Sequence, residues 1–192
     1  MFIQTEQTPN PETMKFLPGR QVMETGVADF TDAEAATRSP LAQMLFDIDG
    51  VQSVFLGEDF ISVTKTGATA WQVLKPMVLG AIMDHFTSGA EVLLSGSEEA
   101  STGNLTDDEY SDDDVDEDVV DQIKELIETR VRPAVAQDGG DIVYKGFKEG
   151  IVYLHMRGAC AGCPSSTATL KIGIENMLRH YIPEVVQVEA IM

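Results

Sequence analysis

An acidic stretch in the middle of the chain divides it into two parts. Residues 95–118 contain eleven acidic side chains and no basic one, and the whole chain of 192 residues has a net charge of −19. Because the stretch has few apolar side chains to bury and dense like charge, we expect a disordered linker. Its last residues suit the acidic first turn of a following helix. The alternative is that the acidic run docks on a basic client surface.

Residues 1–94 are expected to form the first module, a compact α+β domain. The serine and proline at positions 39 and 40 suit the N-cap and first position of a helix. His85 lies near the end of the last helix, and we expect it at the surface. The expected elements are strands at 2–6, 13–17 and 21–24, a helix at 40–46, a hairpin of strands 51–55 and 60–65, and a helix at 71–86 with Pro76 in its first turns.

Residues 119–192 are expected to form the second module, in the order α-β-β-α-β. Apolar residues recur at helical spacing from Val119 to Val131, and this helix should end near Pro133 or a little beyond it. The remaining expected elements are a turn at 138–141, a hairpin of strands 142–147 and 151–156, a helix at 165–181 and a strand at 185–190. The chain is therefore expected to be an α+β protein, with two small α/β-sandwich domains joined by the disordered acidic linker.

Charge and composition exclude some partners and suggest a compartment. Nucleic acid is disfavoured because a net charge of −19 repels the phosphate backbone. No apolar run approaches the roughly 20 residues that span a bilayer, so we expect no membrane partner. The N-terminal residues show neither a signal peptide nor an amphipathic leader. We therefore expect a cytoplasmic protein, or a mature form whose leader has been removed.

The two cysteines, Cys160 and Cys163, are the strongest candidates for chemistry. They lie in a glycine-rich turn between an expected strand and an expected helix. In a reducing compartment they are better interpreted as reactive thiols or metal ligands than as a permanent disulfide. Pro164 suits the first helical position, which would make Cys163 the N-cap, where the helix dipole lowers a thiol pKa. Gly158 and Gly162 let the backbone approach whatever the two sulfurs hold.

Several functions remain compatible with two cysteines at this spacing. An iron–sulfur cluster or a tetrahedral metal normally requires four thiolates, so a second chain or a client protein must supply two. Thiol–disulfide oxidoreduction is the main alternative. It is disfavoured because only 29 residues follow Cys163, too few for the rest of a thioredoxin-like sheet, and because Ala159 stands where thioredoxins carry tryptophan. Zinc usually requires two such cysteine pairs in one chain.

Two longer motifs carry a resemblance to a known family. Residues 119–192 contain Arg132-Pro133, the Asp-Gly-Gly-Asp sequence at 138–141 and the segment Gly-Ala-Cys-Ala-Gly-Cys-Pro-Ser-Ser at 158–166, and they resemble the NifU C-terminal domain. Residues 1 to about 90 contain Thr-Pro-Asn-Pro-Glu-Thr-Met-Lys-Phe-Leu-Pro-Gly at 8–19, and they resemble the N-terminal domain of NFU-type iron–sulfur carriers. The resemblance covers nearly everything except the acidic stretch.

This resemblance implies assembly and delivery of a [4Fe–4S] cluster. Cys160 and Cys163 from two chains would bridge one cluster, so the cluster-bound protein would be a homodimer. The implied partners are an upstream cluster donor and apo iron–sulfur proteins that receive the cluster. No substrate is turned over, so the chain would be a carrier and not an enzyme. The cysteine-bearing modules of longer relatives are absent from this sequence, which favours carriage over de novo assembly.

Other polar residues near the cysteines have weaker claims to a function. Turn geometry accounts for Asp138 and Asp141 with the two glycines between them. Arg157 either offsets the negative charge of a thiolate-bound cluster or is solvated. We assign no role to His155, because a histidine in a strand is more often packed or exposed than ligating.

Overall fold

A computed structural model describes residues 2–94, 117–161 and 164–191, and the chain falls into two compact units. The first unit is Met1–Gly103 and the second is Asn104–Met192. The prediction of disorder concerns residues 95–118, and positions 95–116 lie outside the described residues. Glu117 and Asp118 form the first turn of a helix, as their acidic side chains suggested.

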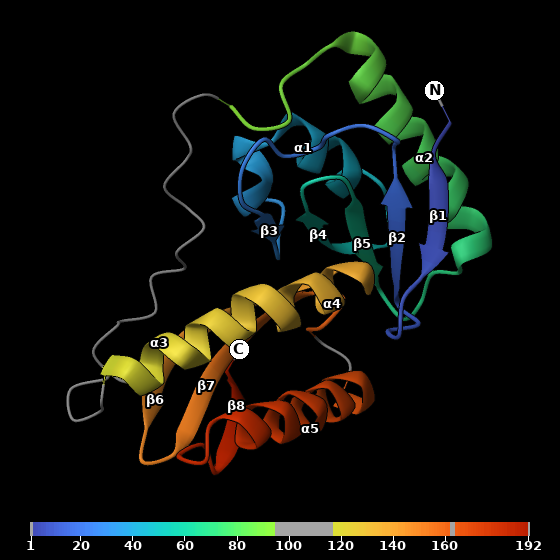
Figure 1. Ribbon diagram of the computed structural model, residues 1–192. Helices are drawn as coiled ribbons and strands as arrows, with labels where there is room; N and C mark the ends of the chain where they lie inside the picture. Colours follow the sequence, from blue (N-terminus) through green and yellow to red (C-terminus); the bar gives the residue numbers. More distant parts are fainter. Residues whose placement is uncertain (1, 95–116, 162–163, 192) are drawn as a thin grey trace. The chain divides into compact units, whose positions relative to one another are not determined.

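The first unit contains a five-stranded antiparallel sheet with two α-helices on one face (Figure 1). The strand order is β1-β2-β5-β4-β3, so the chain does not place its strands in sequence order. The elements are β1 (Gln4–Gln7), β2 (Thr13–Leu17), β3 (Ala28–Phe30), the 3₁₀ helix η1 (Ala35–Arg38), α1 (Pro40–Phe46), β4 (Val51–Leu56), β5 (Ile61–Lys65) and α2 (Trp71–Ser88).

The core of this unit lies between the sheet and the two helices. Met14 and Phe16 of β2 pair with Val63 and Ile61 of β5, so their side chains share the face that the helices cover. Leu41 and Leu45 of α1, and Leu74, Val78 and Ile82 of α2, complete a cluster with no exposed surface at these five positions. The helical spacing of apolar residues in the segment 71–86 agrees with the buried side of α2 at Leu74, Val78 and Ile82.

The start of α1 also agrees with the sequence. The side chain of Ser39 accepts a hydrogen bond from the amide of Ala42 at 3.1 Å, with Pro40 in the first turn. The Ser39 hydroxyl donates in turn to the carbonyl of Val92 at 2.6 Å, which ties the segment after α2 to α1.

Two expectations for this unit are wrong. Residues 21–24 form no strand; the amides of Val22 and Met23 donate to the carbonyl of Glu58, and β3 lies at Ala28–Phe30 instead. His85 is buried with 1% of its surface exposed. It follows Leu74, Val78 and Ile82 at helical spacing, so it lies on the face of α2 that packs on the sheet. Its place near the end of the helix had suggested the surface, but its position on the buried side of the helix decides the outcome.

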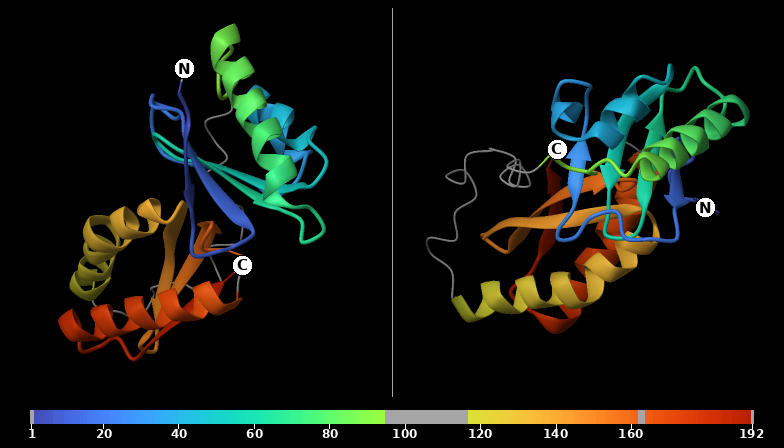
Figure 2. Two further views of the ribbon diagram at one scale, coloured as in Figure 1. Left: turned by 90° about the vertical axis from the view of Figure 1, so that its right-hand side faces the viewer. Right: turned by 90° about the horizontal axis from the view of Figure 1, so that it is seen from above.

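The second unit contains a three-stranded sheet in the order β6-β7-β8 (Figures 1 and 2). β6 and β7 are antiparallel, and α5 crosses back so that β8 runs parallel to β7. Both helical segments pack on one face of the sheet. The elements are α3 (Glu117–Leu126), η2 (Ile127–Val131), α4 (Arg132–Gln137), β6 (Gly140–Lys148), β7 (Ile151–Gly158), α5 (Pro164–Tyr181) and β8 (Gln187–Ile191). The order α-β-β-α-β is confirmed.

A π-helical segment, η2, joins α3 to α4 without breaking the helix. Pro133 in the first turn of α4 has no amide hydrogen, and its ring would collide with the carbonyl four residues earlier in a regular α-helix. A wider π turn before the proline relieves that collision. The helix therefore continues past Pro133 to Gln137, and Arg132 projects from the point where the winding changes.

Candidate functional site

The described cysteine, Cys160, lies in a loop that is tied to both neighbouring elements. β7 ends at Gly158, whose φ of +61° places it in the left-handed region, and the amide of Ala161 donates to its carbonyl at 3.0 Å. The hydroxyl of Thr167 in α5 donates to the carbonyl of Cys160 at 2.9 Å. The loop between the strand and the helix is therefore fixed at Cys160. Cys163, with its expected N-cap role, lies outside the described residues.

The Asp-Gly-Gly-Asp turn packs directly against this loop. The amide of Ala159 donates to the carbonyl of Gly139 at 3.1 Å, and Gly139 has a φ of +80°. A Cβ atom on Gly140 would collide with Sγ of Cys160 and would lie 2.8 Å from the carbonyl oxygen of Arg157. Position 140 therefore requires glycine, because the sulfur of Cys160 occupies the space that a side chain there would need.

The thiol of Cys160 is sheltered from solvent. Only 5% of the residue is exposed. Burial, followed by the negative charges of Asp138 and Asp141, raises the pKa of the Cys160 thiol to about 12. The group is therefore a protonated thiol at neutral pH, and a metal that binds it must displace the proton. The expectation of a lowered thiol pKa at the helix N-terminus applied to Cys163, which lies outside the described residues.

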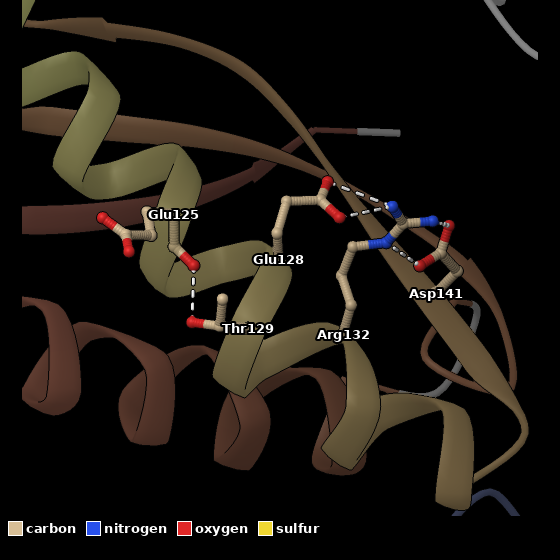
Figure 3. A network of polar contacts seen from close by, with 5 residues as sticks. All are labelled: Glu125, Glu128, Thr129, Arg132 and Asp141. Atoms are coloured by element: carbon tan, nitrogen blue, oxygen red, sulfur yellow. Dashed lines mark hydrogen bonds and ion pairs between the residues drawn. The ribbon is translucent and has the colours of Figure 1, made fainter.

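An ion-pair network holds the first residues of β6 (Figure 3). Nε and a terminal nitrogen of Arg132 donate to the two carboxylate oxygens of Asp141 at 2.8 and 3.1 Å. The other terminal nitrogen donates to both carboxylate oxygens of Glu128 at 3.0 and 2.9 Å. The hydrogen bond with Asp141 is the main reason that the pKa of Arg132 is raised. The network connects the π-to-α transition of the helix to the turn that touches Cys160.

Sequence reasoning missed this network. It explained Asp141 by turn geometry alone and used Arg132-Pro133 only as a family motif. Asp141 is 4% exposed, and a carboxylate so deeply buried normally has a cationic partner. The sequence places Arg132-Pro133 and the Asp-Gly-Gly-Asp motif in the same short module, which was the one indication of a contact. Nothing in the spacing of the two motifs showed that Arg132 and Asp141 meet.

Arg157 and His155 lie on one side of β7, close to the cysteine loop. Arg157 is 5% exposed, so the expectation that it could be solvated is wrong. Its Nε donates to Nδ1 of His155 at 3.3 Å. Burial, followed by the positive charges of Arg157 and Lys145, lowers the pKa of His155. The imidazole therefore favours its neutral form, which can accept this hydrogen bond.

The described residues contain no group of three or more histidine, cysteine, aspartate or glutamate side chains placed to hold a metal ion. Within the same ranges, no helix has the length and apolar character needed to cross a bilayer. The donor groups available for a soft metal are thus the two cysteine thiols, one described and one outside the described residues.

Two family models match the chain. The model described as the N terminus of the scaffold protein Nfu/NifU matches residues 3–89. The model of the NifU-like domain matches residues 123–189, which include both cysteines.

Known proteins align with almost the whole of this chain. The human protein named NFU1 iron–sulfur cluster scaffold homolog, mitochondrial, is 52% identical over 193 residues, which cover 100% of this chain and 72% of that protein. NifU-like protein 4, mitochondrial, from Arabidopsis thaliana is 52% identical over 191 residues, covering 98% of this chain and 65% of the relative. A solution structure of a NifU-like protein from Saccharomyces cerevisiae aligns over 49% of this chain and 85% of its own, with a TM-score of 0.44 and 28% identity.

The expectation of a cytoplasmic location is wrong. The human and the Arabidopsis relatives are named as mitochondrial proteins. The expectation rested on the absence of a targeting segment from the given sequence. That absence does not place a chain in the cytosol, because an import leader is removed from a mature protein.

Proposed function

Because the chain belongs to the NFU family of iron–sulfur cluster scaffold proteins, we propose that it holds a [4Fe–4S] cluster between two copies of itself and passes it to apo-proteins. Cys160 and Cys163 of each copy are the proposed ligands. The observation that carries the proposal is the number of thiols: the chain has two cysteines, and a cluster of this type takes four. Two chains together supply the full set.

The surroundings of Cys160 support a role in holding a cluster. Gly140 brings backbone close to the sulfur without a side chain of its own, and Gly139 and Gly158 adopt the positive φ angles that the neighbouring turns require. The hydroxyl of Thr167 holds the carbonyl of Cys160, so the backbone at Cys160 is fixed by the protein itself. A ligand residue whose backbone is already held loses less conformational entropy on binding.

Delivery is proposed to proceed by ligand exchange. A thiolate of the receiving protein forms a bond to a cluster iron, and the bond from that iron to Cys160 or Cys163 breaks. Repeated at each ligand, this exchange moves the cluster with no change in its electron count and no reaction product. We therefore propose a carrier and not an enzyme, with an upstream donor that supplies the cluster.

The competing function is thiol–disulfide exchange by the same two cysteines. That chemistry needs a thiolate as the attacking group. The raised pKa of Cys160, about 12, leaves very little thiolate at neutral pH and so counts against Cys160 as the attacking thiol. Cluster carriage does not have this difficulty, because iron itself displaces the thiol proton.

The two modules are proposed to divide the work. Residues 119–192 hold the cluster, since both cysteines belong to this module. Residues 1–94 contain no cysteine, and we propose that they contribute to the recognition of particular clients. The acidic stretch at 95–118 joins the two.

Two assays, applied to the wild type and to the cysteine variants, separate the two functions. Under anaerobic conditions, Cys160→Ser and Cys163→Ser should each fail to hold a cluster and to activate an apo iron–sulfur enzyme, because a hydroxyl is a poor ligand for iron in a cluster. The wild type should activate the enzyme and should reduce insulin disulfides little. Strong insulin reduction without enzyme activation would favour the oxidoreductase instead.

A further inference from the structure

The side of α5 that faces away from the sheet is uncharged along its first half. Ala168, Thr169, Ile172, Gly173 and Asn176 are all exposed, and Ile172 keeps 59% of its surface in solvent. We call these five residues the α5 face. Figure 2 shows α5 at the outer edge of its unit. Another protein surface could cover this side of the helix and its exposed isoleucine without burying a charge.

The charged residues of this half of α5 lie to one side of the α5 face. Nζ of Lys171 lies 2.9 Å from a carboxylate oxygen of Glu189 in β8. Glu175 accepts a hydrogen bond from the amide of Val188 in β8 at 3.1 Å. Both side chains therefore serve the internal packing of α5 on the sheet edge, and they leave the outward side without charge.

Gly173 is the most informative residue of the α5 face. Glycine in the middle of a helix costs about 1 kcal/mol relative to alanine. A Cβ atom at position 173 would meet nothing within 4 Å, and its φ lies outside the left-handed region. Nothing in the described structure therefore requires glycine at this position. The absence of a side chain there leaves room for the backbone of another chain to approach α5 closely.

A second copy of the chain fits the α5 face best. α5 begins at Pro164, directly after Cys163, and Ala168 lies about 6 Å further along the helix axis. Two chains that share a cluster through these cysteines must bring the starts of their α5 helices together. The second module has nine acidic and eight basic side chains, so two copies of it repel each other little despite the net charge of −19.

We propose that the α5 face is the protein contact between the two copies in the cluster-bound dimer. Such a contact is isologous: the same residues meet on both sides of a two-fold axis, with the two Gly173 backbones close to each other. The proposal rests on the proposed function, because the shared cluster is what places the second copy there. It adds a surface that determines how tightly the two halves of the cluster site hold together.

The test places a charge on the α5 face of the full-length chain. Ile172→Asp, loaded with iron and sulfide anaerobically, should form the dimer about tenfold or more weakly than wild type in sedimentation, and should lose its cluster faster. Val186→Asp is the matched control, since Val186 is 61% exposed in the same unit but lies on the loop before β8. It should load and dimerise as wild type does. Circular dichroism of both cluster-free variants should match wild type.

Gly173→Ala gives a second, independent test. The stability of the cluster-free chain and the strength of the loaded dimer should change in opposite directions. The cluster-free variant should melt at the same temperature as wild type or slightly higher, because alanine favours the helix and has room. The loaded dimer should nevertheless be weaker than that of wild type. If Ile172→Asp and Gly173→Ala both give dimers as tight as wild type, the α5 face is not the contact, and the shared cluster still stands. If wild type itself holds no cluster, the proposed function fails first.

Discussion

Arg132 holds the carboxylate of Asp141 through two parallel hydrogen bonds, of 2.8 Å from Nε and 3.1 Å from a terminal nitrogen. Such a planar, two-point contact is the strongest form of an arginine–carboxylate pair. The pair connects the helix that precedes the sheet to the first strand of the sheet. Asp141 follows Gly140, which touches Cys160, so the pair also fixes one wall of the cysteine site.

Asp141→Asn should destabilise the second unit. The exposed fraction of the Asp141 side chain is 6%, and that of Arg132 is 32%, so the lost pair is only partly screened by water. We expect the free energy of unfolding to fall by about 1–3 kcal/mol in urea titrations. Glu128→Gln is the control: its side chain is 61% exposed, and its loss should cost at most about 1 kcal/mol. Equal effects of the two variants would show that the buried pair has no special role.

Gly140→Ala should impair both cluster binding and the stability of the second unit. The added Cβ would collide with Sγ of Cys160 and would lie 2.8 Å from the carbonyl oxygen of Arg157, so the sulfur and the adjoining backbone have to move. We expect a lower melting temperature and a lower iron content after anaerobic loading, with loading carried out at a temperature at which circular dichroism shows the variant folded. Gly80→Ala in α2 is the control, because a Cβ there meets nothing within 4 Å. Wild-type iron content in Gly140→Ala would mean that the position of Cys160 in the cluster-free chain is irrelevant to binding.

The stability of the first unit should decrease in mild acid because of His85. Neither ring nitrogen of His85 has a hydrogen-bond partner among the described residues. Burial, followed by the positive charge of Arg20, lowers the pKa of His85 from 6.5. Above pH 6.5 the imidazole is neutral in both the folded and the unfolded chain, and His85 imposes no pH dependence. Below that pH the unfolded chain gains a proton that the folded chain resists, so stability falls, by at most about 1.4 kcal/mol per pH unit from this group.

Thermal unfolding of wild type and His85→Leu between pH 5 and 7.5 measures this contribution. The variant should lose the part of the pH dependence that belongs to His85, so its melting temperature should fall less steeply below pH 6.5. Parallel curves for the two proteins would show that His85 is protonated as readily in the fold as outside it.

The two units should fold independently. The core of the first unit is formed by residues between Met14 and Ile82, and that of the second by residues between Ile123 and Val188, with no residue in common. We expect a fragment of residues 117–192 to melt cooperatively and to hold a cluster, since modules of this size commonly fold alone. It should lose efficiency only toward clients that the first module recognises. A fragment that folds but cannot hold a cluster would show that the two modules share the site.

The sequence predicted the regular parts of the fold because their apolar spacing is strong. The hairpin of β6 and β7, helix α5 and the capped start of α1 all follow from periodicity and from single residues such as Ser39 and Pro40. Contacts between distant residues were not predictable in this way. The spacing from Arg132 to Asp141 does not reveal that a π turn before Pro133 directs the arginine toward β6. His85 shows the opposite failure, because its place near the end of a helix suggested exposure while its helical spacing indicated burial.

At the site, the sequence indicated which residues are reactive but not their environment. Cys160 and Cys163 were identified from their spacing and their position between a strand and a helix. Residue types alone do not show that Cys160 is buried, or that its sulfur occupies the space a side chain at Gly140 would need. That information depends on how β6 meets the end of β7, a pairing between residues 18 positions apart, Gly140 and Gly158.

The central claim is that two chains share one cluster through Cys160 and Cys163. Native mass spectrometry of the anaerobically loaded full-length protein, combined with iron and acid-labile sulfide analysis, tests it most directly. The account predicts a dimer that carries about four irons and four sulfides per two chains. A strictly monomeric chain that holds a stable cluster without an external thiol would contradict it, and so would a protein that binds only zinc under the same conditions.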